Sequence, residues 1–467
     1  MPSTATPDAD AEFVVVGGGV SGLTTGFRLA QTGASVHVLE AEERPGGTAR
    51  TTRRDGWCCD WGPNGFLTNV TDTVELAADL GLGDELVAAS ELAKKRYLWR
   101  DGRLVALPTS PPAFATTPLL GLAAKLRVLG EPFATPRDPN VDETVYEFAQ
   151  RRIGTEFAEA FIRPMVVGIT AGDAREVSLD AMFPRMRAME IEHGSLFRAL
   201  RAKQREAAAK GDTSDGPAGP GGRLTTFRTG GIERLSEALR DRLGASLTTG
   251  FSASQLTRDG DAWVVSNGTA QVRGKRLILA VPSYVAARLV APHHESLGAR
   301  LEALTYAGVR VLGIGFRLAD IPRALDGFGF LVPPGQPLRM LGCLWTSSIF
   351  PDQAPPDHAL LRIIAGGVFD PEFVELSDEE ALEAIRAELH TTLGIEAEPV
   401  FVTHKRWRRA IPQYLRGHLA RVDAIEADAA ELGIHVTGNA YRGVSLNDCV
   451  KRATELAHRL TGAQIVI

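Results

Sequence analysis

The sequence predicts an α/β protein built around a doubly wound, Rossmann-like domain, together with a mixed-sheet second domain and a helical subdomain. Three observations support this fold class. Near its start the chain has a short apolar strand, a glycine-rich turn and an amphipathic helix. From about Leu76 to Ala199 the apolar residues recur mostly at helical spacing. After that, strand-like runs alternate with helical segments up to the last helices, expected over 421–432 and 447–460.

Composition excludes several classes of protein. The chain has 467 residues, of which 44% are hydrophobic and 23% charged, as in ordinary globular proteins of two or three domains. Its net charge of −6 argues against a nucleic-acid partner, which would favour a basic surface. The N-terminal residues lack a secretion signal, and no membrane-spanning segment is expected. Four cysteines without metal-ligand spacing predict a reducing, cytoplasmic environment and no bound metal: Cys58, Cys59, Cys343 and Cys449.

The strongest local motif is a glycine pattern between two expected strands, 13–16 and 35–39. Gly17 permits a tight turn, Gly19 lets the backbone approach a pyrophosphate, and Gly22 allows close packing of helix and strand. The N-terminus of the following helix would offer free N–H groups to phosphate oxygens. This segment is therefore expected to bind a dinucleotide.

Glu40 stands at the end of the second expected strand, where a carboxylate can accept hydrogen bonds from an adenosine ribose. The alternative is a simple glycine turn followed by a solvated glutamate. The motif alone would be weak evidence, but here the strand, the turn, the helix and the acidic residue all occur at the required spacing.

The segments that follow resemble the flavoprotein amine-oxidase superfamily. Arg44 precedes the pair Gly46-Gly47, a segment that in this superfamily lies along the pyrophosphate and ribityl chain of FAD. The run 60–64, DWGPN, matches a segment whose backbone lies against the flavin. Arg44 could alternatively be an exposed turn cation.

The C-terminal region is expected to complete the cofactor site. Residues 435–449 are predicted to form a strand, a glycine turn and the start of a helix, capped by Asn447 or Asp448. The helix N-terminus would face flavin O2 or the ribityl phosphate. A turn closing an ordinary β–α unit is the alternative interpretation.

Five sequence blocks sharpen the resemblance, to the oxygen-dependent protoporphyrinogen oxidases, over nearly the whole chain from Phe13 onward. They are KKRYLWRDGRLVALP, GITAGDAREVS, DGFGFLVP, AIPQYLRGHL and GNAYRGVSLNDC. This resemblance implies non-covalent FAD and a six-electron oxidation of a porphyrinogen in heme biosynthesis, with three O2 reduced to three H2O2. The expected partners are accordingly the porphyrinogen and O2.

The same resemblance assigns site residues. Arg96 matches a propionate-binding arginine, Leu331 and Phe350 match positions that enclose a pyrrole ring, and Gly168 matches a glycine beside the macrocycle. Thr170 departs from the family, which commonly has tyrosine there. The alternative for Arg96 is a surface position, and the alternative for Leu331 and Phe350 is a position in the apolar core. The expected cofactor-binding residues are Gly17, Gly18, Gly19, Val20, Ser21, Gly22, Glu40, Ala41, Arg44, Gly46, Gly47, Gly62, Pro63, Asn64, Gly65, Ala253, Trp407, Gly438, Gly443, Val444, Ser445 and Leu446.

No catalytic dyad stands out, because the flavin carries the redox chemistry and the protein supplies position and exclusion of solvent. The lone histidines His193, His404 and His435 are interpreted as structural or surface groups. Trp407 is expected near the flavin, with a core position as the alternative.

The expected organisation assembles the FAD-binding domain from three stretches. We predict a disordered tail over 1–11 and a flexible loop over 206–223. The FAD-binding domain is expected to comprise 12–90, 224–290 and 400–467, the substrate domain 91–106 and 291–399, and the helical subdomain 107–205. The apolar stretch 104–133 is interpreted as a buried helical lid in preference to a membrane-surface contact.

Other functions remain as alternatives. Coproporphyrinogen III, with four propionates, would favour additional cations around the pocket. A flavin amine oxidase, a carotenoid desaturase and a flavin-free binding module related to GDP-dissociation inhibitors fit less well. Peripheral membrane association and a homodimer are left open.

Overall fold

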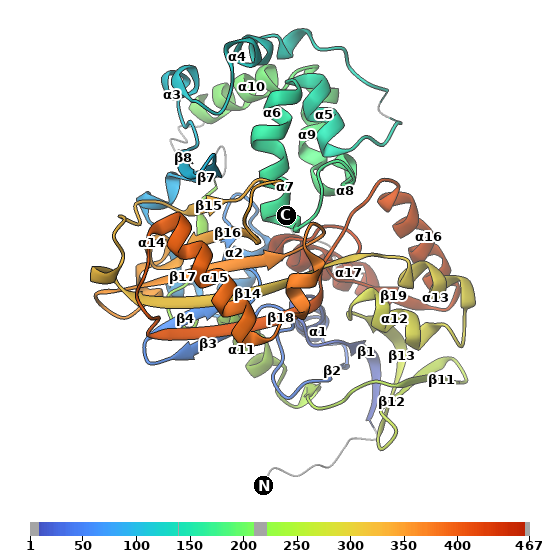
Figure 1. The fold of residues 1–467 in the computed structure, drawn as a ribbon. Helices are drawn as coiled ribbons and strands as arrows, with labels where there is room; N and C mark the ends of the chain where they lie inside the picture. The colour runs from blue at the N-terminus through green and yellow to red at the C-terminus, as the bar shows by residue number, and fades with distance from the viewer. Residues whose placement is uncertain (1–8, 139, 210–221, 463–467) are drawn as a thin grey trace.

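Two seven-stranded sheets and a helical region organise the residues that the computed structural model describes, 9–138, 140–209 and 222–462 (Figure 1). The helical region lies at one end of the molecule, over the second sheet. The predicted α/β class, with a doubly wound domain and a second mixed sheet, is confirmed.

The first sheet contains the predicted doubly wound unit. Its strands, in sheet order, are β10 (Leu247–Thr248), β2 (Val36–Leu39), β1 (Ala9–Val16), β13 (Gln271–Leu279), β12 (Ala262–Ser266) and β11 (Gln255–Asp259), with β19 (Ile434–Val436) also paired to β13. The strands β10, β2, β1, β13 and β19 pair with one another in parallel. β12 pairs antiparallel with β13, and β11 pairs antiparallel with β12 at the edge of the sheet.

Helices bury both faces of this sheet, as expected for a largely parallel sheet. Along β1, Phe13 and Val15 point to one apolar core and Val14 and Val16 to the other, since successive side chains alternate. The helices that contribute to the first core are α1 (Val20–Gln31), α2 (Asp72–Asp79), α11 (Glu233–Leu243) and α17 (Leu446–Thr461). Those that contribute to the second are α12 (Ser283–Val290), α13 (Glu295–Glu302) and α16 (His418–Glu431).

The second sheet is mainly antiparallel. Its order is β18 (Phe401–Pro412), β14 (Tyr306–Arg317), β17 (His358–Gly366), β16 (Met340–Trp345), β15 (Gly329–Leu331), β7 (Tyr97–Arg100) and β8 (Arg103–Ala106), and β15 pairs with β7 in parallel. One face packs its apolar residues on α15 (Asp378–Leu393). The opposite face is turned toward the β3–β4 hairpin and the helical region, and it forms part of the site described below.

Smaller elements connect these layers. The short strands are β3 (Thr51–Arg54) and β4 (Trp57–Asp60), which form a hairpin, and β5 (Phe66–Leu67), β9 (Leu224–Phe227) and β6 (Leu86–Ala88), which form a small sheet. Short helices are α14 (Thr346–Ile349), η1 (Gly83–Glu85), η2 (Glu91–Lys94), η3 (Glu131–Phe133), η5 (Gly244–Ser246), η6 (Leu318–Asp320), η7 (Pro351–Gln353) and η8 (Pro371–Glu375).

From α3 onward the chain confirms the mostly helical pattern expected from about Leu76, whereas β6, β7 and β8 form between residues 86 and 106, where that expectation was wrong. The elements of the helical region are α3 (Pro111–Thr116), α4 (Leu122–Leu129), α5 (Val145–Arg152), α6 (Thr155–Phe157), a π-turn η4 (Ala158–Ile162), α7 (Arg163–Thr170), α8 (Leu179–Met182), α9 (Pro184–His193) and α10 (Leu196–Ala209). Gly154, with φ of +119°, separates α5 from α6, and Gly194, with φ of +65°, ends α9. These two glycines therefore interrupt the helical pattern that the sequence shows up to Ala199.

Buried ion pairs lock this region together. Arg152 pairs with Glu131, and both side chains are fully buried. Glu131 also accepts hydrogen bonds from Ser195 Oγ at 2.5 Å and from the Leu196 amide at 2.9 Å. The loop after α4 is thereby held against the start of α10.

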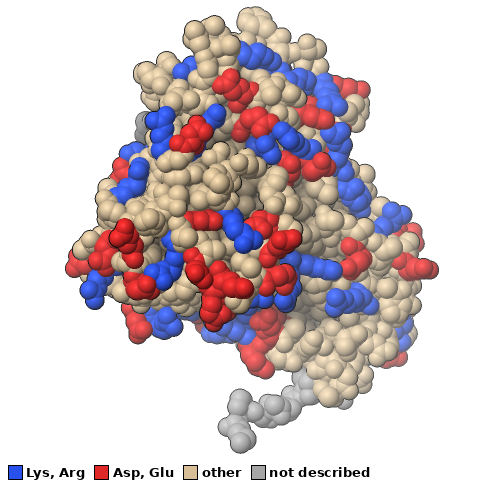
Figure 2. Space-filling model, viewed as in Figure 1, with Lys and Arg blue, Asp and Glu red and all other residues tan. Residues whose placement is uncertain are grey.

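Helix α4 is not a buried lid. Four residues spaced along it and the following η3 are largely exposed: Leu122 (74%), Leu126 (60%), Leu129 (65%) and Phe133 (85%). In Figure 2 the outermost end of the molecule, where Figure 1 places α3 and α4, is mostly uncharged, and charged side chains gather below it. The interpretation of 104–133 as a buried lid is therefore corrected for α4.

Some expected boundaries move. Residues 9–11, assigned to a tail, extend β1, where they pair with β13. Residues 401–412, assigned to the FAD-binding domain, form β18 of the second sheet, whereas α13, assigned to the substrate domain, packs on the first. Of the expected loop 206–223, residues 210–221 lie outside the described part of the chain. Among the described helices, none is long and apolar enough to cross a bilayer.

Candidate functional site

The glycines in the turn between β1 and α1 have different structural roles. Gly17 has a φ of +113°, and a Cβ there would come within 2.5 Å of the Ala280 carbonyl oxygen. A Cβ on Gly22 would overlap the carbonyl oxygen of Gly17. A Cβ on Gly19 would instead meet nothing within 4 Å. Two glycines thus serve the packing of the protein, and Gly19 leaves open space in front of α1.

The N-terminus of α1 offers unsatisfied donors at that space. Gly19 is the N-cap and provides no side-chain cap, and the first turn contains no acidic residue. Val20 and Ser21 stand in this first turn, directly after the open space. Free N–H groups and the positive end of the helix dipole favour an anion such as a pyrophosphate.

Glu40 lies beside this turn at the end of β2. Its carboxylate accepts hydrogen bonds from the Gly18 amide at 2.6 Å and from the Glu42 amide at 2.9 Å. The Glu40 backbone is fixed by Thr248 and Phe251, at 2.9 and 2.8 Å. The side chain is therefore held rigidly next to the glycine turn, with Ala41 exposed beside it. Ala253, two residues beyond Phe251, packs partly buried against the first sheet.

The segment with the glycine pair lies along the same turn. The Gly46 amide donates to the Gly18 carbonyl at 2.8 Å, and Gly46 also forms an isolated bridge with Gly19. Gly46 and Gly47 have φ of +117° and +59°, a region that favours glycine. Arg44 pairs with the buried Glu233 of α11 and donates to the Thr51 carbonyl at 2.7 Å. In this structure Arg44 fixes the loop while its side chain stays partly exposed.

The loop after β4 joins the two sheets. Arg362 of β17 is buried and donates to the carbonyl oxygens of Asp60 at 2.8 Å and Gly62 at 2.5 Å. A Cβ on Gly62 would overlap the Thr48 carbonyl oxygen, and one on Gly65 would come within 2.7 Å of the Thr225 carbonyl. Close packing at Gly62 and Gly65, together with the bonds from Arg362, therefore fixes the backbone conformation of the loop 60–65 between the sheets.

Asp60 and Asn64 of this loop each have a buried polar atom without a hydrogen-bond partner among the described residues. Asp60 Oδ1 accepts hydrogen bonds from Thr51 Oγ1 at 2.7 Å and from the Ile232 amide at 3.0 Å, whereas Oδ2 has no partner among the described residues. Burial raises the pKa of Asp60 to about 6. Asn64, beyond Gly62 and Pro63, keeps a buried Nδ2 without a partner in the described part of the chain.

The C-terminal turn faces the same region. Gly438 has a φ of +131° and open space around its missing Cβ, whereas a Cβ on Gly443 would overlap the Asp448 side chain. Ser445, which follows Val444, caps α17 in a capping box with Asp448, so neither Asn447 nor Asp448 is the N-cap. Leu446 is buried at the start of α17, which packs along α1. This turn therefore precedes a helix that packs directly on α1.

These features fit FAD. Open space at Gly19 and Gly438 accommodates a ligand that the glycine backbone can approach. The uncapped start of α1 matches a pyrophosphate, and the fixed Glu40 carboxylate matches a ribose. The partnerless buried Nδ2 of Asn64 and Oγ1 of Thr437 leave polar atoms free to bond a ligand.

One face of the second sheet, the face on which Arg362 lies, forms a further side of the candidate site. The central strands β15, β16 and β17 are mostly buried, yet Leu331 in β15, Leu344 in β16 and Ile364 in β17 remain half-buried. The register places all three on one face, because Ile364 pairs with Gly342, Gly342 with Leu331, and Leu344 with Arg362. These apolar side chains line a surface beside the cofactor loop.

Helix α7 borders this surface. A Cβ on Gly168 would come within 2.6 Å of Leu331 Cδ2, so the structure brings these two predicted residues together. Gly168 and the following Ile169 are exposed. Thr170 is turned inward, donating to the Val166 carbonyl at 2.8 Å and accepting from the Gly172 amide at 3.0 Å. The residue that departs from the family therefore caps the helix and forms no part of the exposed wall.

Arg96 reaches the same face from the opposite edge. It lies two residues before Leu98, which pairs with Leu331 in parallel register, so strand alternation places it on this face. Its guanidinium stacks 4.8 Å from the centre of the Phe328 ring, and it forms no ion pair with any described residue. Burial lowers the pKa of Arg96. A half-buried cation without a counter-ion is suited to binding an anionic ligand group.

Phe350 lies elsewhere. It is only 2% exposed and packs with Ala93 and Ile349, against the partly buried Phe328 and Leu344. The structure gives its ring no surface to present to a ligand, so the expected substrate contact is corrected: Phe350 supports the wall from within.

Trp407 stands near the cofactor loop, on β18. Its ring lies 6.4 Å from that of Trp61, and the ammonium of Lys405 lies 4.8 Å from the Trp61 ring and 4.7 Å from the Trp407 ring. His404, on the opposite face of the strand, pairs with Asp378 at 2.8 Å. His193 lies 3.8 Å from Glu192, and burial lowers the pKa of His435. No metal-binding cluster occurs among the residues that the structure describes.

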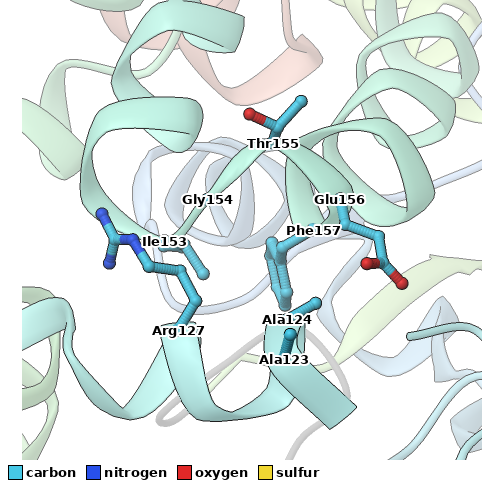
Figure 3. A pocket seen from close by; sticks show the side chains of 8 residues that line it. All are labelled: Ala123, Ala124, Arg127, Ile153, Gly154, Thr155, Glu156 and Phe157. Carbon is cyan, nitrogen blue, oxygen red and sulfur yellow. The ribbon is translucent and has the colours of Figure 1, made fainter. Parts of the chain in front are cut away.

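A pocket of about 240 Å³ in the helical region is structural (Figure 3). Arg127 there donates to the carbonyls of Arg151 and Arg152 at the end of α5. Glu156 accepts from the Gly121 amide at the start of α4, at 2.5 Å. Its charged groups are thus used to join helices. A second pocket of about 490 Å³, between the β7–β8 turn and α15, likewise includes none of the expected site residues.

Several residues at the site were not found from the sequence. They are Phe328, Leu344, Arg362, Ile364 and Lys405. No local motif distinguishes an apolar strand residue that faces a ligand from one that faces the core. The half-exposure of Leu344 and Ile364 within buried strands, together with the sheet register, is what identifies them.

Comparisons with known proteins agree with this geometry. The family described as flavin containing amine oxidoreductase matches residues 20–461. The chloroplastic protoporphyrinogen oxidase of Nicotiana tabacum is 30% identical, covering 99% of this chain and 88% of the relative. The coproporphyrinogen III oxidase of Bacillus subtilis is 26% identical, covering 95% and 96%. A crystal structure of a putative protoporphyrinogen oxidase from Exiguobacterium superposes with a TM-score of 0.84 at 25% identity, covering 98% and 100%.

Gly19→Val should separate cofactor binding from folding. A Cβ at this position meets no protein atom within 4 Å, so the circular dichroism spectrum should match that of the wild type, while the added methyl groups extend into the space before α1. We expect the Kd for FAD to rise at least tenfold, measured by flavin fluorescence on titrating the apoprotein. Gly83→Ala, at an exposed glycine that also has open space, is the control. Unchanged FAD affinity in Gly19→Val would contradict the assignment.

Asp60→Asn should change the pH dependence of stability. A carboxyl whose pKa is raised from 3.8 to about 6 on folding binds more protons in the folded state, so stability falls as pH rises from about 4 to 6. The asparagine keeps the Oδ1 acceptor and removes this loss. We expect it to be more stable than the wild type by about 3 kcal/mol at pH 8, with little difference near pH 4. Urea unfolding across this range, with the exposed Asp55→Asn as control, measures it; equal pH profiles for Asp60→Asn and the wild type would refute it.

Proposed function

Since this chain belongs to the flavin-containing amine oxidoreductases, and is an FAD-dependent oxidoreductase, we propose that it oxidises protoporphyrinogen IX to protoporphyrin IX in porphyrin biosynthesis. Three two-electron oxidations would remove six electrons, and each would reduce one O2 to H2O2. The family consists of oxidoreductases, so the flavin-free binding module is not retained. Bound FAD supplies the two-electron oxidation, and the protein residues position the substrate.

The observation that carries the proposal is an apolar sheet face with a partnerless guanidinium at one edge. Leu331, Leu344 and Ile364 offer the flat apolar contact that a tetrapyrrole requires. Arg96 offers two parallel N–H donors to a propionate carboxylate, which would fix the orientation of the macrocycle. Gly168 permits close approach along one border.

The cofactor side follows from the residues already described. We assign the pyrophosphate to Gly17, Gly18, Gly19 and the start of α1, the ribose to Glu40, and the flavin to the loop 60–65, Trp407 and the turn from Gly438 to Leu446. Arg362 holds this loop over the substrate face. The protein then contributes position and water exclusion, with no side-chain acid or base assigned.

Coproporphyrinogen III is a second candidate substrate, oxidised by the same chemistry. A specific observation favours it: a second cation, Lys405, lies on the same sheet face without a carboxylate partner among the described residues. Relatives with either name match nearly the whole chain.

The direct test is aerobic oxidation of both porphyrinogens, followed by porphyrin fluorescence, with protein whose flavin spectrum has been recorded first. Turnover of either one supports a porphyrinogen oxidase, and faster turnover of protoporphyrinogen supports the first assignment. Flavin-loaded protein that oxidises neither would refute the proposal.

Arg96→Met should weaken substrate binding. Loss of a charged hydrogen-bond donor should lower kcat/KM about 10- to 100-fold for both porphyrinogens, mainly through KM, with an unchanged flavin spectrum. Lys95→Met is the matched control, because the adjacent Lys95 pairs with Asp326 away from this face. An unaltered KM in Arg96→Met would exclude Arg96 as the carboxylate anchor.

We also propose that the protein is cytoplasmic and binds a membrane surface peripherally through α4 and η3. The exposed residues Leu122, Leu126, Leu129 and Phe133 recur at helical spacing, with Lys125 on the same helix. The buried Glu131 anchors the segment from behind, so the apolar face is presented by a rigid support. An apolar macrocycle that partitions into lipid would be delivered near the site.

A double substitution, Leu126→Glu with Leu129→Glu, tests this contact. Because burial of each leucine contributes about 1.5–3 kcal/mol, we expect cosedimentation with phosphatidylcholine–phosphatidylglycerol vesicles to fall at least tenfold. Leu318→Glu, at another exposed leucine outside the helical region, should leave vesicle binding unchanged. Equal sedimentation of all three proteins would argue against α4 as the contact.

A further inference from the structure

Lys405 is a cation of the substrate face without a protein counter-ion. Its ammonium lies between the aromatic faces of Trp61 and Trp407, at 4.8 and 4.7 Å from the ring centres. It forms no salt bridge with any described carboxylate. The neighbouring Arg406 and Arg408, in contrast, pair with Asp378 and Glu375. The two indole rings hold the ammonium in place and leave its N–H donors free.

The register of the second sheet aligns Lys405 with the proposed substrate wall. Lys405 pairs with Val311, Val311 with Ile364, Ile364 with Gly342, and Gly342 with Leu331. Paired residues share a face, so these side chains form one row from β18 to β15. Most of that row is apolar or glycine, and the cation stands at its end.

Arg96 stands at the other end of the same face. β18 and β7 are separated by five strand spacings of about 4.8 Å, or about 24 Å at the backbone, and both side chains are long and flexible. The row from Lys405 to Leu331 is therefore apolar or glycine between two cations, each without a carboxylate partner among the described residues. Arg362, on the same face, is buried and its guanidinium donates to the carbonyls of Asp60 and Gly62. Such an arrangement suits a flat apolar ligand with carboxylates on opposite sides.

We infer that Lys405 is a second carboxylate anchor, opposite Arg96, and that it favours a porphyrinogen with four propionates over one with two. This inference rests on the proposed function. The tetra-acid carries a carboxylate on every pyrrole, so it can meet cations at both ends of the face. Protoporphyrinogen IX carries propionates on two adjacent pyrroles, so its single acidic side needs only Arg96. Lys405 is thus a specificity residue that contacts substrate without taking part in electron transfer.

Lys405→Met in the flavin-loaded enzyme tests this inference. We expect kcat/KM for coproporphyrinogen III to fall about tenfold, mainly through KM, while that for protoporphyrinogen IX changes less than twofold. Lys405→Arg should retain most of the activity toward coproporphyrinogen. Arg408→Met removes a nearby charge that pairs with Glu375 on the surface and should leave both substrates unaffected.

Equilibrium binding provides a readout independent of turnover. The Kd of the product coproporphyrin, measured by quenching of protein fluorescence, should rise about tenfold in Lys405→Met, and that of protoporphyrin should not. Equal effects on both porphyrins, no effect on either, or loss of FAD would overturn the inference. Failure of the wild type to oxidise either porphyrinogen would instead refute the proposed function, so the two failures are distinguishable.

Discussion

The site depends on one buried guanidinium. Arg362 extends from the centre of the second sheet and donates to the carbonyl oxygens of Asp60 and Gly62. Because a buried arginine without hydrogen bonds would be strongly destabilising, its side chain holds the loop at that place. The loop in turn belongs to the cofactor half of the molecule. The hydrogen bonds from Arg362, in the second sheet, to the backbone of the loop 60–65 therefore fix the position of this loop relative to the substrate face.

A second set of buried bonds orders the segments that converge on this loop. The Glu233 carboxylate, at the start of α11, forms a salt bridge with Arg44 and accepts a hydrogen bond from the Thr51 amide. The Asp60 carboxylate accepts hydrogen bonds from the Thr51 hydroxyl and the Ile232 amide. Two distant stretches of chain, 44–60 and 232–233, thus meet through two buried carboxylates. The raised pKa of Asp60 shows the energetic consequence, since burial opposes its charge although hydrogen bonds support it. The hydrogen bond from the Gly18 amide to the Glu40 carboxylate likewise fixes the glycine-rich turn at the start of α1.

The sequence predicted the parts of the site that rest on local backbone requirements. Gly17, Gly22 and the glycine pair at 46–47 occur where a Cβ or an ordinary φ would not fit, so a motif can reveal them. Leu344, Ile364 and Lys405 could not be predicted, because their place depends on strand register between segments far apart in the chain. The same limitation explains β18, whose residues were assigned to the wrong sheet, and Phe350, whose ring turned out to lie behind the wall. Helix breaks at Gly154 and Gly194 were readable in principle, but a glycine within a helical pattern does not by itself fix a left-handed turn.

The geometry separates oxidation from recognition. In the proposed assignment, the cofactor would be held by glycine backbones, helix N-termini and the loop bound by Arg362, none of which depends on which porphyrinogen is bound. The centre of the substrate face is apolar and would accept any tetrapyrrole of similar size. Discrimination between acids would therefore occur toward the two sides of the sheet, where Lys405 stands on β18 and Arg96 directly precedes β7. Under this proposal, substitutions on β18 or beside β7 would alter substrate preference while the cofactor loop, held by Arg362, stays in place.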